Sequence, residues 1–161
     1  MRKIYTIGVY NSTEDQFFDK LIKNKIDAFC DLRRRRGVRG AKYSFVNSLR
    51  LQRKLEELKI NYFHFIELSP TNEIRDKQKE DDKQKKIKKR DRVLLGKVFI
   101  SLYIAEHLTN ENILRFEKKI LDEKALNIAL FCVEDDHRAC HRSLLAYHLN
   151  RRNPNNKIVN L

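Results

Sequence analysis

The order of the apolar segments is the feature that most constrains the fold of this chain. Short apolar runs rich in β-branched residues alternate with longer stretches whose apolar residues recur at helical spacing. Such alternation is typical of α/β proteins, in which helices connect parallel strands. We therefore predict one α/β domain over residues 1–161, built on a mostly parallel twisted sheet of about five strands with helices on both faces. The expected strands are residues 3–9, 26–32, 60–68, 125–133 and 157–161.

The segments between these strands carry helix signals. Ser12 and Thr13 offer a hydroxyl cap, and two acids follow them in the first turn, where the helix dipole favours negative charge. Asp135 or Asp136 can cap the last helix in the same way. The apolar composition of residues 93–107 predicts that their helix is buried. The other expected helices begin after Thr13 and cover residues 43–58, 112–121 and 137–151.

Residues 71–92 interrupt this pattern. Lys, Arg, Asp, Glu and Gln dominate the segment, and Ile74 and Ile87 are its only apolar residues. Such a sequence buries too little apolar surface to offset the entropy of ordering it. We expect a basic insertion that is either mobile or projects from the body as an exposed helix, and we favour a mobile arm with a helical end.

The positive charge is clustered rather than spread. Of a formal net charge of +13, residues 33–42 contribute six positive and no negative side chains, and residues 75–92 contribute ten positive and five negative. This clustering favours a nucleic-acid partner, DNA or RNA, over a membrane surface, although charge can also serve solubility alone. The residues expected to bind phosphates are Arg33, Arg34, Arg35, Arg36, Arg39 and Lys42, and the Lys-rich insertion is expected to hold phosphates with them.

Missing motifs exclude several functional classes. There is no G-x-G-x-x-G or Walker-type glycine loop, so nicotinamide, flavin and Walker-type nucleotide binding are not expected, and we predict no cofactor. Three cysteines, an odd number, indicate free thiols in a reducing compartment. No apolar stretch is long enough for a signal core or a membrane span, so we expect a cytoplasmic protein.

Residues 132–143, with the sequence CVEDDHRACHRS, carry the densest set of reactive side chains. A helix that starts at Asp136 would place His137, Cys140 and His141 on one face, three and four residues apart. A thiol near a helix N-terminus and beside a histidine is favoured as the thiolate. Glu134, just beyond the strand, can act as a base or hold a cationic group.

Each of these residues also has a purely structural interpretation. Cys132 and Cys140 can fill core positions, since free cysteine is commonly buried. The acids at 134–136 can serve only as charges at a helix start. A zinc site of Cys132, His137, Cys140 and His141 has suitable ligand types, but the seven-residue gap between the cysteines is wider than usual and no second pair exists. We keep zinc as an alternative to a site without metal.

Four short motifs, in this order along the chain, resemble those of a known family. They are Thr6-Ile7-Gly8, Asp31-Leu32-Arg33, Cys132-x-Glu134 and Cys140-His141-Arg142-Ser143. Together they resemble the prokaryotic family called domain of unknown function 488, with a likeness that extends over nearly the whole chain.

The resemblance implies a compact α/β domain with the motifs gathered at one end of the sheet, and it supplies no reaction. Family members often carry histidine and serine after the first motif, whereas this chain has Val9 and Tyr10. If that histidine is catalytic in the family, this member is altered at that step.

Three functional hypotheses remain open. The first is a nucleic-acid- or nucleotide-directed protein, in whose catalytic form Glu134 is the general base or acid and Arg142 stabilises negative charge. The second is a small-molecule or thiol enzyme that uses a Cys140 thiolate. The third is a non-catalytic binding module in which Arg142 pairs with Asp31 or Glu134. Whether the chain is an enzyme stays open, and the candidate catalytic residues are Asp31, Arg33, Glu134, Cys140, His141 and Arg142.

Overall fold

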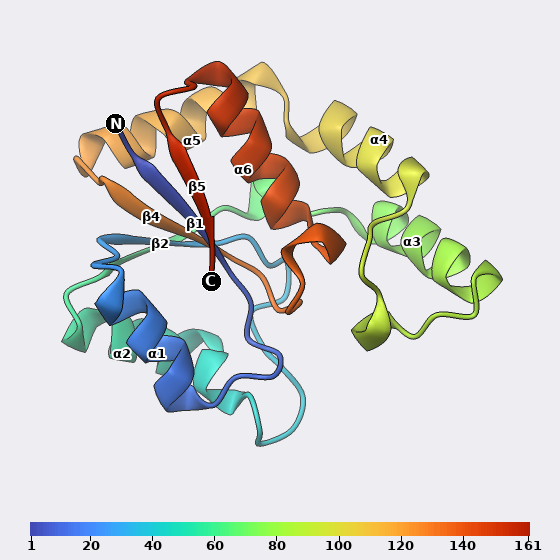
Figure 1. The fold of residues 1–161 in the computed structure, drawn as a ribbon, viewed down its shortest axis with the longest axis horizontal. Coiled ribbons are helices and arrows are strands. Elements are labelled where there is room, and N and C mark those ends of the chain that lie inside the picture. Colours follow the sequence, from blue (N-terminus) through green and yellow to red (C-terminus); the bar gives the residue numbers. More distant parts are fainter.

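The centre of the molecule is a five-stranded parallel sheet, which confirms the predicted α/β fold (Figure 1). The structure is a computed structural model that describes residues 1–161, apart from the side chain of Arg90. The strands lie in the order β3-β2-β4-β1-β5, and all neighbouring strands are parallel. Their bounds are β1 Lys3–Ile7, β2 Ala28–Asp31, β3 Asn61–His64, β4 Asn127–Phe131 and β5 Lys157–Asn160.

β4 lies in the middle of the sheet because both of its faces are covered. Ile128 and Leu130 point into one core cluster, and Ala129 and Phe131 point into the other. This arrangement follows from the alternation of side chains along a strand, and an uninterrupted apolar run is typical of a strand buried on both sides. The carboxyl ends of β1, β4 and β2 therefore lie side by side at one edge of the sheet.

Helices cover both faces of the sheet, as predicted (Figure 1). α1 and α2 contribute to the core cluster that contains Phe29 and Phe131. α5 and α6 contribute to the opposite cluster, which contains Ile4 and Leu130. The bounds of these helices are α1 Glu14–Lys23, α2 Ser48–Glu57, α5 Asn110–Asp122 and α6 His141–Arg152.

The first helix begins where the sequence predicted. The Thr13 hydroxyl accepts a hydrogen bond from the Gln16 backbone N–H, and the Gln16 side chain accepts one from the Thr13 N–H. Because each residue satisfies a backbone donor of the other, the start of α1 is fixed by local chemistry.

Two expected elements divide in the structure. The segment predicted as one helix over residues 43–58 forms a short 3₁₀ helix, Ser44–Val46, before α2, because Asn47 between them is extended, with ψ 140°. The segment predicted as a strand over residues 60–68 ends at His64 and continues as a second 3₁₀ helix, Ile66–Leu68.

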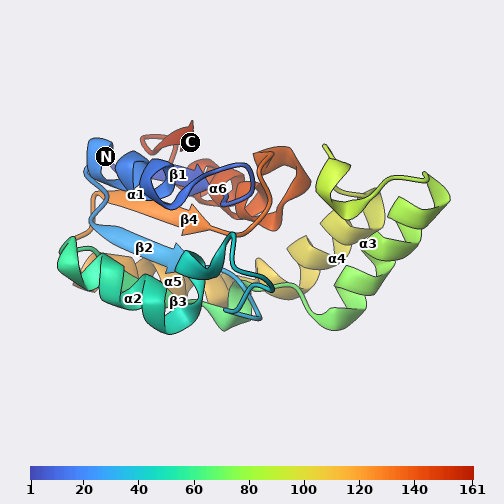
Figure 2. The ribbon, with the colours of Figure 1, turned by 90° about the horizontal axis from the view of Figure 1, so that it is seen from below.

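The polar insertion forms a helix, α3 Asn72–Gln84, rather than an irregular arm. Thr71 caps its start, and Ile74, Gln78 and Asp82 form its buried side. α3 packs against α4, Lys97–His107, and the two helices project from the sheet as a hairpin (Figures 1 and 2). Mobility of this insertion stays a prediction.

The sequence had suggested that α4 is buried, but the structure leaves part of it exposed. Phe99, Tyr103 and His107 face inward, whereas Val98 and Ile104 are exposed. The reason is its place in the hairpin, where α3 and α6 cover only part of its surface. Within the described residues, no helix combines the length and the apolar character that a membrane crossing needs.

Candidate functional site

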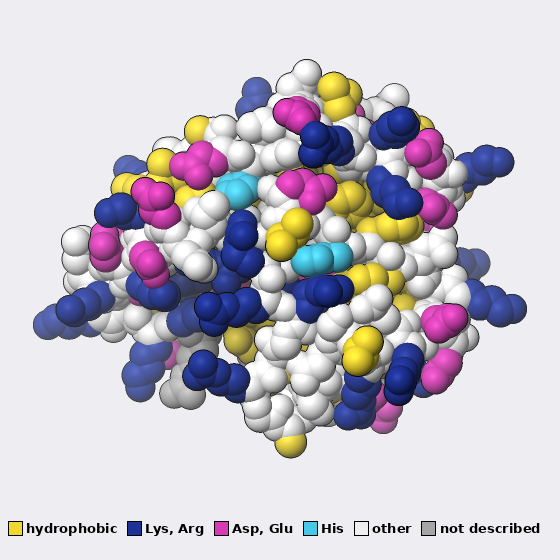
Figure 3. Space-filling view, turned by 180° about the vertical axis from the view of Figure 1, so that it is seen from behind, with side chains coloured by type: hydrophobic (Ala, Val, Ile, Leu, Met, Phe, Trp, Pro, Cys, Tyr) yellow, Lys and Arg dark blue, Asp and Glu magenta, His cyan; other side chains and the backbone are white. Residues whose placement is uncertain are grey.

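A cavity of about 720 Å³ opens between the carboxyl edge of the sheet and the α3–α4 hairpin. The strands point toward this hairpin in Figure 2, so residues that follow β1, β2 and β4 reach the cavity wall. Among the lining residues that the structure describes, seven are Lys or Arg and three are Asp or Glu, which makes the wall predominantly cationic. Lys and Arg side chains gather on this side of the molecule in Figure 3.

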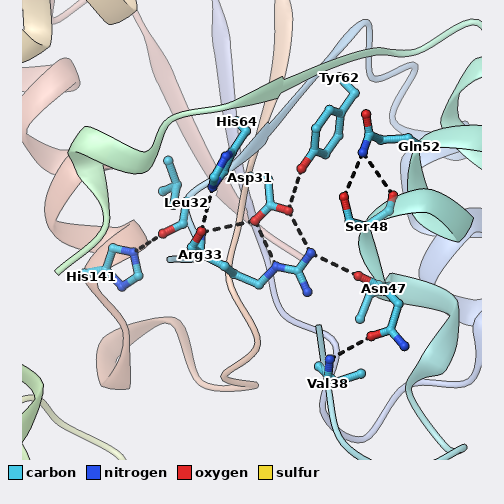
Figure 4. A network of polar contacts seen from close by, with 11 residues as sticks. Asp31, Leu32, Arg33, Val38, Asn47, Ser48, Gln52, Tyr62, His64 and His141 are labelled. Carbon is cyan, nitrogen blue, oxygen red and sulfur yellow. Dashed lines mark hydrogen bonds and ion pairs between the residues drawn. The ribbon is translucent and has the colours of Figure 1, made fainter. Parts of the chain in front are cut away.

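Two cysteines and a histidine meet in the wall of this cavity. The Sγ atoms of Cys132 and Cys140 and a ring nitrogen of His141 all lie within 4.8 Å of one another, and all three residues are buried. The His141 Nε2–H donates to the Leu32 carbonyl oxygen, 3.1 Å away (Figure 4). The opposite nitrogen, Nδ1, therefore carries the lone pair and lies 3.7 Å from the Cys140 Sγ.

The helix start that we expected at Asp136 is wrong, and this changes the composition of the cluster. Residues His137–Ala139 form a 3₁₀ turn, Cys140 is extended with φ −139° and ψ 143°, and α6 begins at His141. Cys140 thus caps the helix, and His137 does not belong to the group of converging ligand atoms. An Asp136 carboxylate oxygen accepts from the Arg138 N–H, which stabilises the turn that delays the helix.

The two thiols share one environment but differ in acidity. A hydrogen bond with Cys140, together with burial, raises the pKa of Cys132 well above its ordinary value. Burial opposes ionisation of Cys140, but the hydrogen bond from Cys132 and the nearby Arg142 cation lower its pKa to about 7. Burial lowers the pKa of His141, so its imidazole is neutral at pH 7.

The loop that carries Glu134 is fixed through its backbone. Arg142 is 1 % exposed, and its guanidinium donates to the carbonyl oxygens of Glu134 at 2.6 Å and Asp135 at 2.8 Å. The third hypothesis had Arg142 pair with the carboxylate of Asp31 or Glu134. In the structure Arg142 instead binds backbone carbonyl oxygens. Gly8 lies against the same loop, where an added Cβ atom would overlap the Glu134 carbonyl oxygen.

The Glu134 carboxylate faces the cavity and is held by cations of the insertion. Its Oε1 atom lies 3.4 Å from the Lys89 Nζ and 3.7 Å from an Arg92 nitrogen. Arg92 also donates to Asp82 of α3 at 2.8 Å and to the Ala139 carbonyl oxygen at 3.3 Å. Arg92 thus links the hairpin to residues 132–140, which we call the motif loop.

Asp31 and Arg33 form a buried ion pair at the end of β2 (Figure 4). The Arg33 Nε and Nη2 atoms donate to the two Asp31 oxygens at 2.9 and 2.7 Å, and the Tyr62 hydroxyl donates to Asp31 at 2.9 Å. The Arg33 guanidinium also covers the Phe131 ring, 4.6 Å from its centroid. Arg33 reaches the cavity wall, whereas Asp31 and Arg142 support the wall from behind.

The predicted phosphate-binding residues divide into two groups. Arg35 and Arg39 line the cavity beside Arg33. Arg34 instead donates to the carbonyl oxygens of Pro70 and Ser69, each at 3.1 Å. Arg36 is partly buried and Lys42 stands over the Tyr43 ring; neither lines the cavity.

Several cavity residues were not found from the sequence. Cys132 lies in the C-x-E motif but was not counted among the catalytic candidates. Arg75, Lys79, Lys89 and Arg92 come from the insertion, which was expected to hold phosphates as a whole but without these residues being singled out. A usable signal for Arg75 was its position beside Ile74, the one apolar residue that α3 buries.

Tyr10 occupies the position where family members often have serine, and it also lines the cavity. Its ring lies 5.4 Å from that of Tyr43, centroid to centroid, and both rings belong to the wall. The preceding residue, Val9, is fully buried in the core. The departure from the family pattern thus replaces a polar pair with one core residue and one cavity aromatic.

Comparisons with known proteins give a family but no individual relative. The family model described as "Domain of unknown function DUF488" matches residues 13–149. The matched range contains the D-L-R, C-x-E and C-H-R-S motifs. No curated protein and no solved structure matches the chain.

Proposed function

The chain belongs to the DUF488 family, and from this premise we propose that it is a nucleic-acid- or nucleotide-directed protein whose cavity binds a phosphate-bearing ligand. The cationic wall would hold the phosphate. Glu134, Cys140 and His141 would contact the part of the ligand that reacts.

One observation carries this proposal: three arginines of the cavity wall each have a buried guanidinium nitrogen without an acceptor. These nitrogens are Arg33 Nη1, Arg75 Nε and Arg92 Nε, and no partner among the described residues accepts from them. A buried donor without an acceptor costs about 1–3 kcal/mol. The oxygens of a phosphate would satisfy such donors with charge-assisted hydrogen bonds, so a phosphate-bearing ligand removes this cost.

The aromatic part of the wall suits a base. Tyr10 and Tyr43 line the cavity as a tilted pair, and bases stack on such side chains with little dependence on sequence. The cavity volume of about 720 Å³ lies within the range of ligand sites, roughly 300–1,000 Å³. A nucleotide or a nucleic-acid end combines the anionic and the flat apolar parts that this wall would bind.

Three candidate residues are placed to take part in a reaction. Glu134, Cys140 and His141 all line the cavity. In this proposal Glu134 is the general base or acid, because a residue that lines the cavity would be within reach of a ligand bound there. Asp31 and Arg142 act as positioning residues, because their hydrogen bonds hold the surrounding chain, whereas Arg33 pairs with Asp31 and also offers a donor to the phosphate.

A non-catalytic binding module is the second candidate, and the burial of Asp31 and Arg142 behind the wall favours it. Glu134→Gln separates the two. If Glu134 serves only structure, the loss of its ion pairs with Lys89 and Arg92 lowers the melting temperature of the variant. In that case neither the wild type nor the variant alters an oligonucleotide. If Glu134 is catalytic, wild-type protein alters the oligonucleotide and the folded variant does not.

Binding of a labelled oligonucleotide tests the cavity directly. Arg35→Ala combined with Arg39→Ala removes two exposed cations of the wall. Each lost phosphate contact on duplex DNA makes the log–log salt dependence less steep by about 0.9, so we expect a change of about 2 with the double variant. Fluorescence anisotropy at several salt concentrations measures both the affinity and this slope.

The matched control is Arg53→Ala combined with Arg151→Ala. Both arginines are exposed and neither lines the cavity, so the change in net charge is the same. Equal loss of affinity in the two double variants would mean that only total charge matters, and the cavity would not be the binding site.

A further inference from the structure

We propose that Cys132, Cys140 and His141 form a zinc site whose fourth position faces the cavity. This inference concerns the metal alone and does not depend on which ligand the cationic wall binds. It also differs from the zinc alternative considered from the sequence, since His137 lies outside the cluster.

The spacing of the Cys140 and His141 atoms fits a tetrahedral ion, and the Cys132 thiol lies close to the same point. With Zn–S near 2.3 Å and Zn–N near 2.0–2.1 Å, a sulfur and a nitrogen on one tetrahedral zinc lie about 3.6 Å apart. The Cys140 Sγ and His141 Nδ1 atoms are 3.7 Å apart, and the Cys132 Sγ lies within 4.8 Å of both. The extended backbone of Cys140 makes this possible, because it lets two adjacent residues direct their side chains to one point.

The histidine is already oriented as metal-binding histidines are. Such a residue commonly donates its second ring N–H to a backbone carbonyl, which fixes the tautomer and the ring plane. His141 donates from Nε2 to the Leu32 carbonyl oxygen at 3.1 Å, which leaves the Nδ1 lone pair toward Cys140. The Tyr103 ring packs edge-on against the imidazole, 5.3 Å between centroids, and restricts its rotation.

Three ligands with an open fourth position indicate a reactive rather than a structural ion. Two thiolates and one imidazole suit zinc, and a catalytic zinc keeps one position for water or substrate. Glu134 lines the same cavity but is not one of the converging ligands. It would accept a proton from zinc-bound water, giving zinc-bound hydroxide and a protonated Glu134 carboxyl.

The test is metal uptake by the full chain, kept reduced with a phosphine, stripped by a chelator and free of nucleic acid. Titration with Co²⁺ should give one equivalent per chain, with the d–d bands of a tetrahedral ion and a thiolate-to-cobalt charge-transfer band. One equivalent of Zn²⁺ should then remove these bands. Because no oligonucleotide is present, this result is separate from the outcome of the binding experiment above.

Cysteine variants assign the ligands. Cys132→Ser and Cys140→Ser should each weaken the charge-transfer band by about half or more, since each removes one of two thiolate ligands, whereas Cys30→Ser should keep the full band, since Cys30 is a third buried free thiol outside the cluster. Far-UV circular dichroism confirms that each variant is folded. Uptake of less than one equivalent by the wild type, or a charge-transfer band of full intensity in a folded Cys132 or Cys140 variant, would overturn the proposal; the wild-type titration decides it even if a variant unfolds.

Discussion

At the scale of single residues, Gly8 is the glycine with the least room for a side chain. A Cβ atom there would overlap the Glu134 carbonyl oxygen and lie 2.8 Å from the carbonyl carbon. The loop cannot retreat easily, because Arg142 holds the same carbonyl oxygen at 2.6 Å. We expect Gly8→Ala to lower the free energy of unfolding by about 1–3 kcal/mol, the usual range for overpacking, as measured by urea denaturation.

Gly37→Ala is the control for this substitution. The nearest atom to an added Cβ at Gly37 is an Asn47 side-chain oxygen at 3.9 Å, an ordinary contact. The control should therefore leave the urea midpoint nearly unchanged. A Gly8→Ala protein as stable as the control would show that the motif loop adapts, and the close approach would not explain this glycine.

Asp31 is expected to matter for stability because its charge is buried and paired. Removing one partner of a buried ion pair leaves the other charge uncompensated, at about 3–5 kcal/mol. Asp31→Asn should lower the free energy of unfolding by that amount, since Arg33 is only 3 % exposed at the side chain. Asp19→Asn, which removes an exposed pair with Lys23, should change it by at most ~1 kcal/mol. Similar midpoints for the two variants in urea would contradict this account.

The sequence identified the reactive residue types but not what each one binds. Glu134, Cys140 and His141 were recognised because thiol, imidazole and carboxylate are uncommon close together, and all three reach the cavity. Arg142 was expected to pair with a carboxylate, yet it binds two backbone carbonyl oxygens. Carbonyl positions depend on the path of the folded chain, so residue type alone could not have predicted these partners.

At the scale of elements, local signals located the start of one helix and misplaced the start of another. Thr13 fixes the start of α1 through bonds within four residues, and the sequence shows them directly. The start of α6 was misplaced, because Asp136 caps a single 3₁₀ turn and Cys140 is extended after it. Thr13 and Asp136 both offer a capping side chain, and only tertiary contacts decide whether one turn or a full helix follows.

Arg92 joins two elements, and its loss should loosen one of them. It bonds Asp82 of α3 and the Ala139 carbonyl oxygen, and Asp82 in turn accepts from Gln78 at 2.7 Å. We expect Arg92→Ala to speed amide hydrogen exchange in residues 72–84 while the sheet stays protected, since local stability follows such contacts. Mass spectrometry of peptides after exchange measures this.

The control is Lys85→Ala, which removes an exposed ion pair with Asp81 near the end of the same helix. It changes the charge of the hairpin equally but breaks no bond to the body. Faster exchange across residues 72–84 in both variants would assign the effect to charge and not to the bridge made by Arg92.

At the scale of the whole molecule, the parallel sheet was predictable and the cavity was not. Alternating strands and helices place the ends of β1, β2 and β4 at one edge by topology alone. Four of the seven described cations in the wall, however, come from an insertion that is nearly all polar. Its helix depends on a few buried residues, such as Ile74 and Gln78, that contact distant parts of the chain. Nothing local to that segment indicates where it docks.

The cavity also predicts that Arg75 lowers stability while it serves binding. Burial lowers the pKa of Arg75, and the Arg34 and Arg35 cations act in the same direction. A lowered pKa for a cation means that its charge is less favourable in the folded state than in the unfolded chain, so the charge opposes folding at neutral pH. Its Nε atom is one of the buried donors without an acceptor among the described residues.

We therefore expect Arg75→Met to raise the free energy of unfolding by about 0.5–2 kcal/mol in the absence of ligand. Inorganic phosphate should raise the melting temperature of the wild type, because ligand that binds only the folded state stabilises it, and should do so less in the variant. Arg34→Met is the control, and it should lose stability because its guanidinium holds the carbonyl oxygens of Ser69 and Pro70. An Arg75→Met protein that melts lower than wild type without phosphate, or gains as much from phosphate, would show that this cation is satisfied within the chain and is not reserved for an anionic ligand.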